Sequence, residues 1–359
     1  MSHKLTRVST AMGQIHRHSN IGAGLIALSV GCSSLLAAVP PAFAPPLVAG
    51  QPQLWTLPIA DRTTPFPTLS AVQIDRQLGL YQQFLAQHGT PDILIIGSSR
   101  SLQGIDPVAL QQQLSDQGYP DLKIFNLGMN GATAQVEQVL LESVLLESVF
   151  PQQPMAQPPK LIVWGDGARA FNQGRKDITH QKLQTAPGLA ALKAGQRPIL
   201  VPDLQGPTIG DQREALGLQI VREVFVPEQY FQRFAKIPGA YDRDYRDFAL
   251  DGAQAAATER LLQRVQQQQI PIVFVNLPLT DIYLDTDRQR HEMSFREFQQ
   301  DLVAQGKLTR FIDLGQAWPN RYDRFADPSH INQQGAQAVG ERLGQELGRD
   351  PAFRQWIAK

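Results

Sequence analysis

The sequence predicts a three-layer α/β/α fold around a five-stranded parallel sheet, with an insertion after the third strand. Three observations lead to this prediction. Short apolar segments recur along the chain, amphipathic helical segments separate them, and small polar residues follow each apolar segment. Segments that are apolar almost throughout are typical of parallel strands buried on both faces. The chain has 359 residues, 42% of them hydrophobic, which is enough for a sizeable core.

The amino-terminal segment has the pattern of an export signal. Residues 1–20 carry basic side chains and no acidic one, and an apolar run of about 19 residues follows, Ile21–Val39. Ala42–Ala44 fits the small-x-small cleavage rule, but Pro45 directly after it hinders cleavage. We therefore expect residues 1–44 to be a signal peptide or an uncleaved signal-anchor that contacts the membrane. Either places the remaining chain in the periplasm or on the outer face of the cytoplasmic membrane.

Composition excludes several classes of function. Lys and Arg number 33 and so do Asp and Glu, so the net charge is zero, which argues against a nucleic-acid partner. The single cysteine excludes an intrachain disulfide framework and a Cys-cluster metal site. We predict neither a metal nor another cofactor.

Residues 45–70 are rich in proline and threonine without periodicity, which predicts a semi-rigid linker. The α/β domain is expected over residues 71–350. Its strand candidates are short and nearly continuously apolar: Asp92–Gly97, Leu122–Leu127, Leu161–Gly165, Ile270–Asn276 and Arg310–Leu314.

Helical segments alternate with these strands. One is predicted to begin at Asp106-Pro107, where an N-cap residue precedes a first-turn proline. The others are Thr133–Val149, Gly252–Gln268, Ser294–Gln305 and Asn332–Leu347. This alternation predicts a doubly wound sheet of the flavodoxin-like kind. Residues 173–250 break the rhythm and are rich in aromatic residues, so they are interpreted as an insertion, either a lid over the site or a plain helical elaboration.

Reactive residues follow the predicted strands, where ligands bind in open α/β sheets. Asp327 and His330 are three residues apart, so the carboxylate can hold Nδ1–H of the imidazole and leave Nε2 as a general base. A serine hydroxyl needs such a base to become a nucleophile, and Ser99 follows the first strand. We predict a catalytic group of Ser99, His330 and Asp327. The alternatives are helix capping by Asp327 and an ordinary or anion-binding turn at Ser99.

Two segments resemble blocks of the SGNH (GDSL-like) hydrolase family. Gly97–Ser101, with the sequence GSSRS, resembles the nucleophile block and places Ser99 at the nucleophile. Asp327–Gly335, with the sequence DPSHINQQG, closely resembles the last block, in which Asp327 and His330 complete the triad.

A third segment, Asn126–Thr133, with the sequence NLGMNGAT, is similar to the second block of that family. The resemblance implies that the N–H group of Gly131 contributes to the oxyanion hole. It covers roughly residues 90–345 and leaves the insertion unmatched.

The chain departs from the family pattern in two places. Ser98 stands where the family has Asp, and GSSR-type variants belong to exported branches that modify cell-surface polymers. Gly167 stands where the family has an Asn that donates to the oxyanion, and the loss of one such donor costs about 10²–10³ in turnover. Asn172 and Arg169 are candidate substitutes.

Two further side chains are predicted to line the pocket. Arg100 binds an acidic substrate group or holds a helix carbonyl, and Asp281, which follows the fourth strand, faces the substrate. The resemblance then implies an exported serine esterase that removes or transfers an O-acyl group on a cell-surface or extracellular carbohydrate. Two alternatives stay open: an O-acyltransferase of exopolysaccharide modification, and a non-catalytic glycan-binding or assembly factor on the same fold.

Overall fold

The computed structural model describes residues 68–145, 158–194, 211–233 and 247–358. The chain divides into two units, Met1–Ala49 and Gly50–Lys359, and all described residues belong to the second. The predicted export segment and residues 45–67 of the predicted linker therefore lie outside the described residues. Within the described ranges, no helix has both the length and the apolarity that crossing a bilayer requires.

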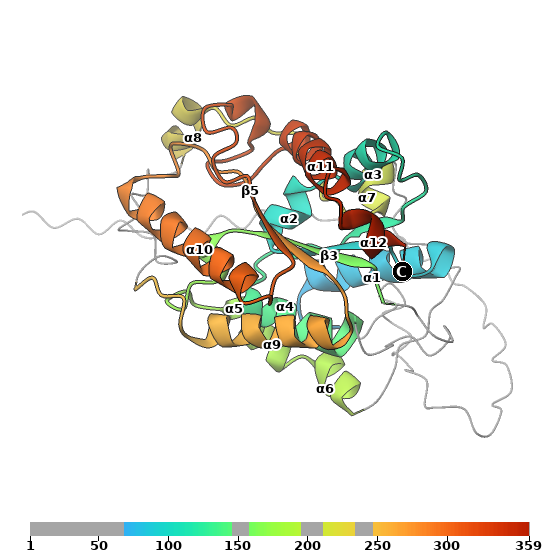
Figure 1. The fold of residues 1–359 in the computed structure, drawn as a ribbon. Helices are drawn as coiled ribbons and strands as arrows, with labels where there is room; N and C mark the ends of the chain where they lie inside the picture. The colour runs from blue at the N-terminus through green and yellow to red at the C-terminus, as the bar shows by residue number, and fades with distance from the viewer. Residues whose placement is uncertain (1–67, 146–157, 195–210, 234–246, 359) are drawn as a thin grey trace, which may run out of the picture. The chain divides into compact units, whose positions relative to one another are not determined.

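The fold prediction is confirmed by a five-stranded parallel sheet with helices on both faces (Figure 1). The strand order is β2-β1-β3-β4-β5, as in flavodoxin-like folds, and the direction of winding reverses between β1 and β3. The bounds are β1 Ile93–Gly97, β2 Ile124–Asn126, β3 Leu161–Asp166, β4 Ile272–Asn276 and β5 Arg310–Asp313.

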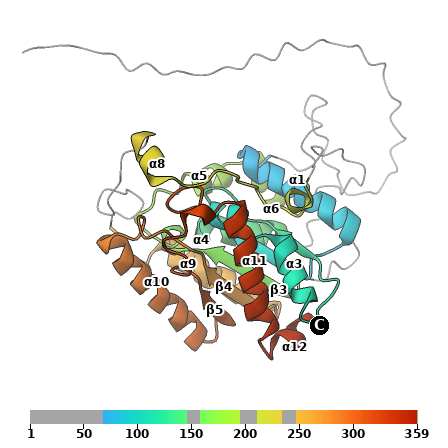
Figure 2. The same cartoon turned by 90° about the horizontal axis from the view of Figure 1, so that it is seen from above.

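The two faces of the sheet carry separate apolar cores, because alternate strand residues point to opposite faces. Leu94 and Ile96 face one core, and Ile93 and Ile95 face the other. The first core packs under α1 (Val72–His88), α4 (Ala134–Leu140), α9 (Ala253–Gln267) and α10 (Thr286–Ala304). The second packs under α3 (Pro107–Ser115), α11 (Gln333–Gly348) and α12 (Phe353–Ile357), and Figures 1 and 2 show α3 beside α11.

Three helices differ from the expected segments. Helix α1 is long, and the sequence pattern does not predict it. Helix α10 begins at Thr286 rather than Ser294, because the Asp285 carboxylate accepts a hydrogen bond from the N–H of Arg288 at 3.0 Å and caps it. Helix α4 ends at Leu140 and continues as a π-helical turn, Leu141–Leu145. The rest of the predicted segment lies outside the described residues.

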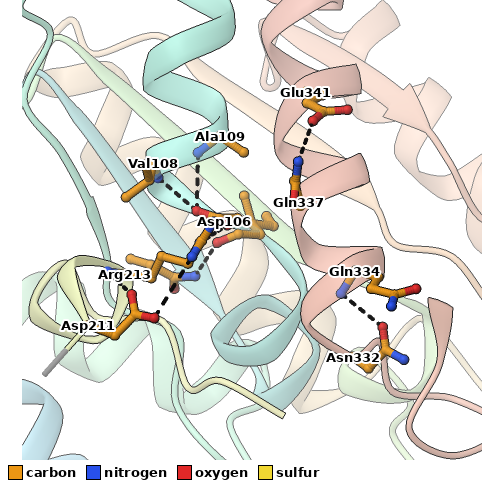
Figure 3. A network of polar contacts seen from close by, with 11 residues as sticks. Asp106, Val108, Ala109, Asp211, Arg213, Asn332, Gln334, Gln337 and Glu341 are labelled. Carbon is orange, nitrogen blue, oxygen red and sulfur yellow. Dashed lines mark hydrogen bonds and ion pairs between the residues drawn. The ribbon is translucent and has the colours of Figure 1, made fainter. Parts of the chain in front are cut away.

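The described part of the insertion forms short helices: α5 (Ile178–Gln184), α6 (Pro187–Lys193), α7 (Gln212–Ala215) and α8 (Pro227–Arg233). Helix α7 is held by an ion pair in which Nε of Arg213 lies 2.7 Å from Oδ2 of Asp106 (Figure 3). The other oxygen of this fully buried Asp106 accepts from the N–H groups of Val108 and Ala109, which caps α3. The insertion is thereby tied to the core of the fold.

Residues after α7 run between two loops that carry predicted catalytic residues. The N–H of Gln219 donates to the carbonyl of Leu102 in α2 (Ser99–Gly104) at 2.9 Å. The N–H of Phe225 donates to the carbonyl of Phe325 at 2.7 Å, in the segment that leads to His330. This part of the insertion is therefore hydrogen-bonded both to α2 and to the segment before His330.

Candidate active site

The turn after β1 presents Ser99 at the sheet edge. Gly97 adopts φ +135°, and a Cβ atom there would overlap the carbonyl oxygen of Gly165 on β3, so only glycine fits. Ser98 caps α2, its Oγ accepting from the N–H of Arg100 at 3.3 Å. Ser99 is then the first residue of the helix, and it remains partly exposed.

The structure brings Ser99, His330 and Asp327 into one hydrogen-bonded chain. Oγ of Ser99 lies 3.0 Å from Nε2 of His330, and Nδ1 of His330 lies 2.8 Å from Oδ2 of Asp327. An ionised carboxylate only accepts hydrogen bonds, so the ring proton sits on Nδ1 and Nε2 is left to accept from the serine. Both distances are within hydrogen-bond reach, and the first lets the serine proton pass directly to Nε2.

The Asp327 carboxylate is held in its charged form. Burial alone would raise its pKa, but the hydrogen bond and charge of His330 and the N–H groups of Ser329 and His330 outweigh burial, so the pKa lies below its ordinary value. Oδ1 accepts from these two N–H groups at 2.7 and 2.8 Å, which fixes the turn. Asp327 and His330 are thus oriented without a substrate.

Asn332 fixes the loop that carries this pair. Its Oδ1 accepts from the N–H groups of Gln334 and Gly335 and caps α11. Its Nδ2 donates to the carbonyls of Asp323 and Phe325 at 2.8 and 3.2 Å. The predicted helix start is confirmed, and the buried amide locks the loop onto it.

A buried carboxylate supports the nucleophile turn from β3. Asp166 is 2% exposed and accepts from the N–H of Ser98 at 3.0 Å, its Oγ–H at 2.9 Å and the N–H of Gly167 at 3.0 Å. Burial raises the pKa of Asp166, while the charge of Arg100 and these hydrogen bonds oppose the rise. Asp166 therefore fixes Ser98, the residue directly before Ser99.

The second block supplies a backbone donor. Gly131 adopts φ +73° in a turn closed by a hydrogen bond from the N–H of Ala132 to the carbonyl of Met129, a position that favours glycine. Among the described residues, none accepts a hydrogen bond from the N–H of Gly131 or of Ser99. Both groups belong to residues that line one cavity and have no acceptor within the described part of the chain.

A small cavity of about 30 Å³ opens over Ser99 and His330. It combines Gly131 with the apolar side chain of Leu279, the aromatic side chain of Tyr283 and three arginines. The remaining lining residues are Ser98, Arg100, Asp166, Arg169, Ala170, Arg175 and Ser329.

Of three predicted binding residues, two lie outside the cavity of the nucleophile and one lines it. Asn172 is fully buried outside the cavity lining, where its Oδ1 accepts from the N–H groups of Gly174 and Ala249 and holds a loop. Asp281 is exposed and accepts from Tyr322 Oη at 2.7 Å, also outside the cavity. Arg100 does line it, with Nη2 donating to the carbonyls of Leu277 and Pro278 after β4.

Sequence reasoning missed Asp166 and Arg175 as parts of the site. Asp166 ends β3 and pairs with Asn276 of β4, so a polar residue at the end of a buried strand was the available signal. Arg175 lies in the insertion, which carries no strand-end position to mark it. Within the described ranges, no group of three His, Cys, Asp or Glu side chains is arranged to hold a metal ion.

Comparisons with known proteins give likeness to solved structures only. No family model and no curated protein matches the chain. Matching structures include a G-D-S-L family protein from Desulfitobacterium hafniense DCB-2, the acetyl xylan esterase AlAXEase, and a GDSL-like lipase from Bacteroides thetaiotaomicron VPI-5482.

These three chains are 13%, 13% and 10% identical to this one. The matches cover 70%, 71% and 71% of this chain and 97%, 98% and 87% of theirs, with TM-scores of 0.35, 0.35 and 0.32. The likeness to these three solved structures concerns the fold, and the chemistry of this chain is argued from its own side-chain geometry.

Proposed function

We propose that the protein is a serine hydrolase of acyl esters. The observation that carries the proposal is the chain of contacts from Ser99 Oγ to His330 Nε2, at 3.0 Å, and from His330 Nδ1 to Asp327, at 2.8 Å. This arrangement activates a hydroxyl for attack on a carbonyl and needs no cofactor.

The reaction runs in two halves. Ser99 Oγ forms a bond to the carbonyl carbon while its proton passes to His330 Nε2, and the carbonyl electrons move to oxygen. His330 then protonates the leaving alkoxide, the ester C–O bond breaks, and an acyl-enzyme remains. Water, deprotonated by His330, attacks the acyl group and releases Ser99. Asp327 stays ionised and stabilises the imidazolium in both halves.

The finer assignment is an exported enzyme that removes a short acyl group from a carbohydrate. The cavity of about 30 Å³ in front of Ser99 supports a short acyl group such as acetyl. The basic, then apolar, amino-terminal sequence supports export. The carbohydrate substrate is supported by the resemblance of the GSSRS block to exported polymer-modifying branches.

A comparison of the wild type with S99A and an aryl ester series tests the proposal. We expect turnover of the acetyl ester, at least tenfold slower turnover of the octanoyl ester, and a fluorophosphonate adduct on Ser99 that S99A lacks. An acetylated polysaccharide should release acetate. Transfer of the acyl group to an added glycan in preference to water would show a transferase instead. If the wild type shows no turnover and forms no adduct, the hydrolase and the transferase are both excluded.

A further inference from the structure

Gly167 lies between Asp166 and Ala168, at the end of β3, in a conformation that any residue can adopt. Its φ of −163° and ψ of 178° are extended backbone. A side chain there would nevertheless have to displace Arg100, because a Cβ atom would overlap its Nη1 and lie 3.0 Å from its Cζ. The guanidinium group of Arg100 thus fills the space that a side chain at position 167 would take.

The guanidinium is clamped on one edge. Nη2 donates to the carbonyls of Leu277 and Pro278, the second at 3.1 Å. Among the described residues, no acceptor takes a hydrogen bond from Nη1 or Nε; Nε is fully enclosed, whereas Nη1 is not among the enclosed atoms. Arg100 is 8% exposed overall and lines the same cavity as Ser99 and His330. Arg100 is therefore a cavity-lining residue whose Nη1 has no acceptor among the described residues.

The charge of this group is permanent. A guanidinium does not lose its proton in proteins, and two buried carboxylates, Asp166 and Glu292, face it. Burial raises the pKa of both carboxyls, and the Arg100 charge acts against that rise. A fixed cation beside a nucleophile, in surroundings with little water, strongly stabilises negative charge that develops on a substrate.

We propose that Arg100 is a cationic oxyanion donor. When Ser99 Oγ bonds to the carbonyl carbon, the carbonyl electron pair moves to oxygen and the serine proton moves to His330. Nη1–H of Arg100 then donates to that oxygen, beside the N–H groups of Ser99 and Gly131. Arg100 so takes over the role that the resemblance gives to an Asn at position 167. This inference rests on the proposed esterase function.

Three variants test it with the acetyl ester. R100A should lose about 10²–10³-fold in kcat with little change in KM, because the donor acts in the transition state. G167A should lose as much, since its added methyl carbon displaces Nη1 while the Arg100 side chain remains. In R100A/G167N the space is free for an amide donor, and kcat should recover at least tenfold over R100A.

A chemical rescue separates a donor from a structural tether. Added methylguanidinium should restore part of the R100A turnover but none in S99A. The control is R310A, which removes an arginine of β5 that is paired with Glu346 of α11. Arg310 does not line this cavity, so R310A should keep the wild-type kcat. The thermal midpoint of every variant shows whether it is folded.

Each result decides between the two proposals. Ser99-dependent turnover that survives within threefold in R100A and G167A overturns the oxyanion role alone. A loss in R100A that neither the added G167N substitution nor methylguanidinium reverses also overturns it, because Arg100 then only holds the loop after β4. Wild-type protein without Ser99-dependent turnover overturns the esterase function and this inference together.

Discussion

Asp166 accepts two hydrogen bonds from Ser98, one from the backbone N–H at 3.0 Å and one from the hydroxyl at 2.9 Å. The pairing of β1 with β3, which sets Gly97 beside Gly165, brings these residues together. The family that the sequence resembles carries its carboxylate at the position of Ser98. In this chain the carboxylate comes from β3, and Ser98 is its hydrogen-bond donor.

This relationship predicts that S98D is harmful, although it restores the residue of the resembled family. Two carboxylates would then face each other in a buried site, and an uncompensated buried charge costs about 3–5 kcal/mol. We expect the free energy of unfolding in urea to fall by about that amount, with a loss of esterase activity. S294D on the exposed side of α10 is the control and should change stability by less than about 0.5 kcal/mol.

The double variant S98D/D166N should be more stable than S98D. An amide at position 166 donates to the new carboxylate, so the hydrogen bond is kept with its direction reversed. A double-mutant cycle with D166N should give a coupling of about 0.5–3 kcal/mol. Additive effects of the two substitutions would show that the carboxylate of Asp166 does not position the turn.

The orientation of His330 by Asp327 predicts a large effect of D327N. An Asn amide can donate to Nδ1, which would favour the tautomer with the proton on Nε2, and that nitrogen could not accept the serine proton. We expect kcat to fall about 10³–10⁴-fold while the protein stays folded. D323N, an exposed Asp to Asn change in the same loop, should leave kcat unchanged. Equal activity of D327N and wild type would remove Asp327 from the mechanism.

The sheet could be predicted from sequence because its strands are buried on both faces. Such strands are apolar at every position, and this pattern does not depend on contacts from distant parts of the chain. Helix α1 and the first turns of α10 show where this fails. They carry many polar side chains, and α10 starts at the Asp285 cap in a charged stretch, so an apolar stripe does not mark its first turns.

The contacts of the candidate site also include some that could be predicted from sequence and some that could not. Asp327 and His330 are three residues apart, so their contact could be predicted from local spacing. Ser98 and Asp166 are 68 residues apart, and their contact depends on the register of β1 against β3, which composition does not reveal. A Cβ atom at position 167 would overlap Arg100, and this depends on the rotamer of Arg100 as well as on strand register. The sequence alone therefore showed only that an expected Asn was missing.

Glu137 on α4 predicts a pH dependence of stability. It is 3% exposed, and its Oε1 has no hydrogen-bond partner among the described residues. Burial and the charge of Asp166 hold its pKa well above the ordinary value, although a hydrogen bond with the backbone of Gly97 acts against the rise. Between the unfolded and the raised folded pKa, the native state binds a proton that the unfolded state releases. Stability therefore falls as pH rises through this window.

E137Q removes this titration. Relative to wild type, E137Q should be more stable at pH 8 than at pH 5, as measured by its free energy of unfolding in urea at both values. E341Q, an exposed change on α11, should show the wild-type pH dependence. The same pH dependence in E137Q and wild type would mean that Glu137 titrates alike in the folded and unfolded states.

The ion pair of Arg213 with Asp106 predicts that the insertion stabilises the whole domain. R213A leaves Oδ2 of a fully buried carboxylate without its partner, so we expect a loss of about 1–3 kcal/mol in urea unfolding. D106A should cost more than R213A, because it also removes the N-cap of α3. The loss of that cap adds about 0.5–2 kcal/mol. R321A breaks an exposed Arg–Asp pair instead and should cost less than about 1 kcal/mol. A loss in R213A no larger than in R321A would mean that α7 rests on the core without supporting it.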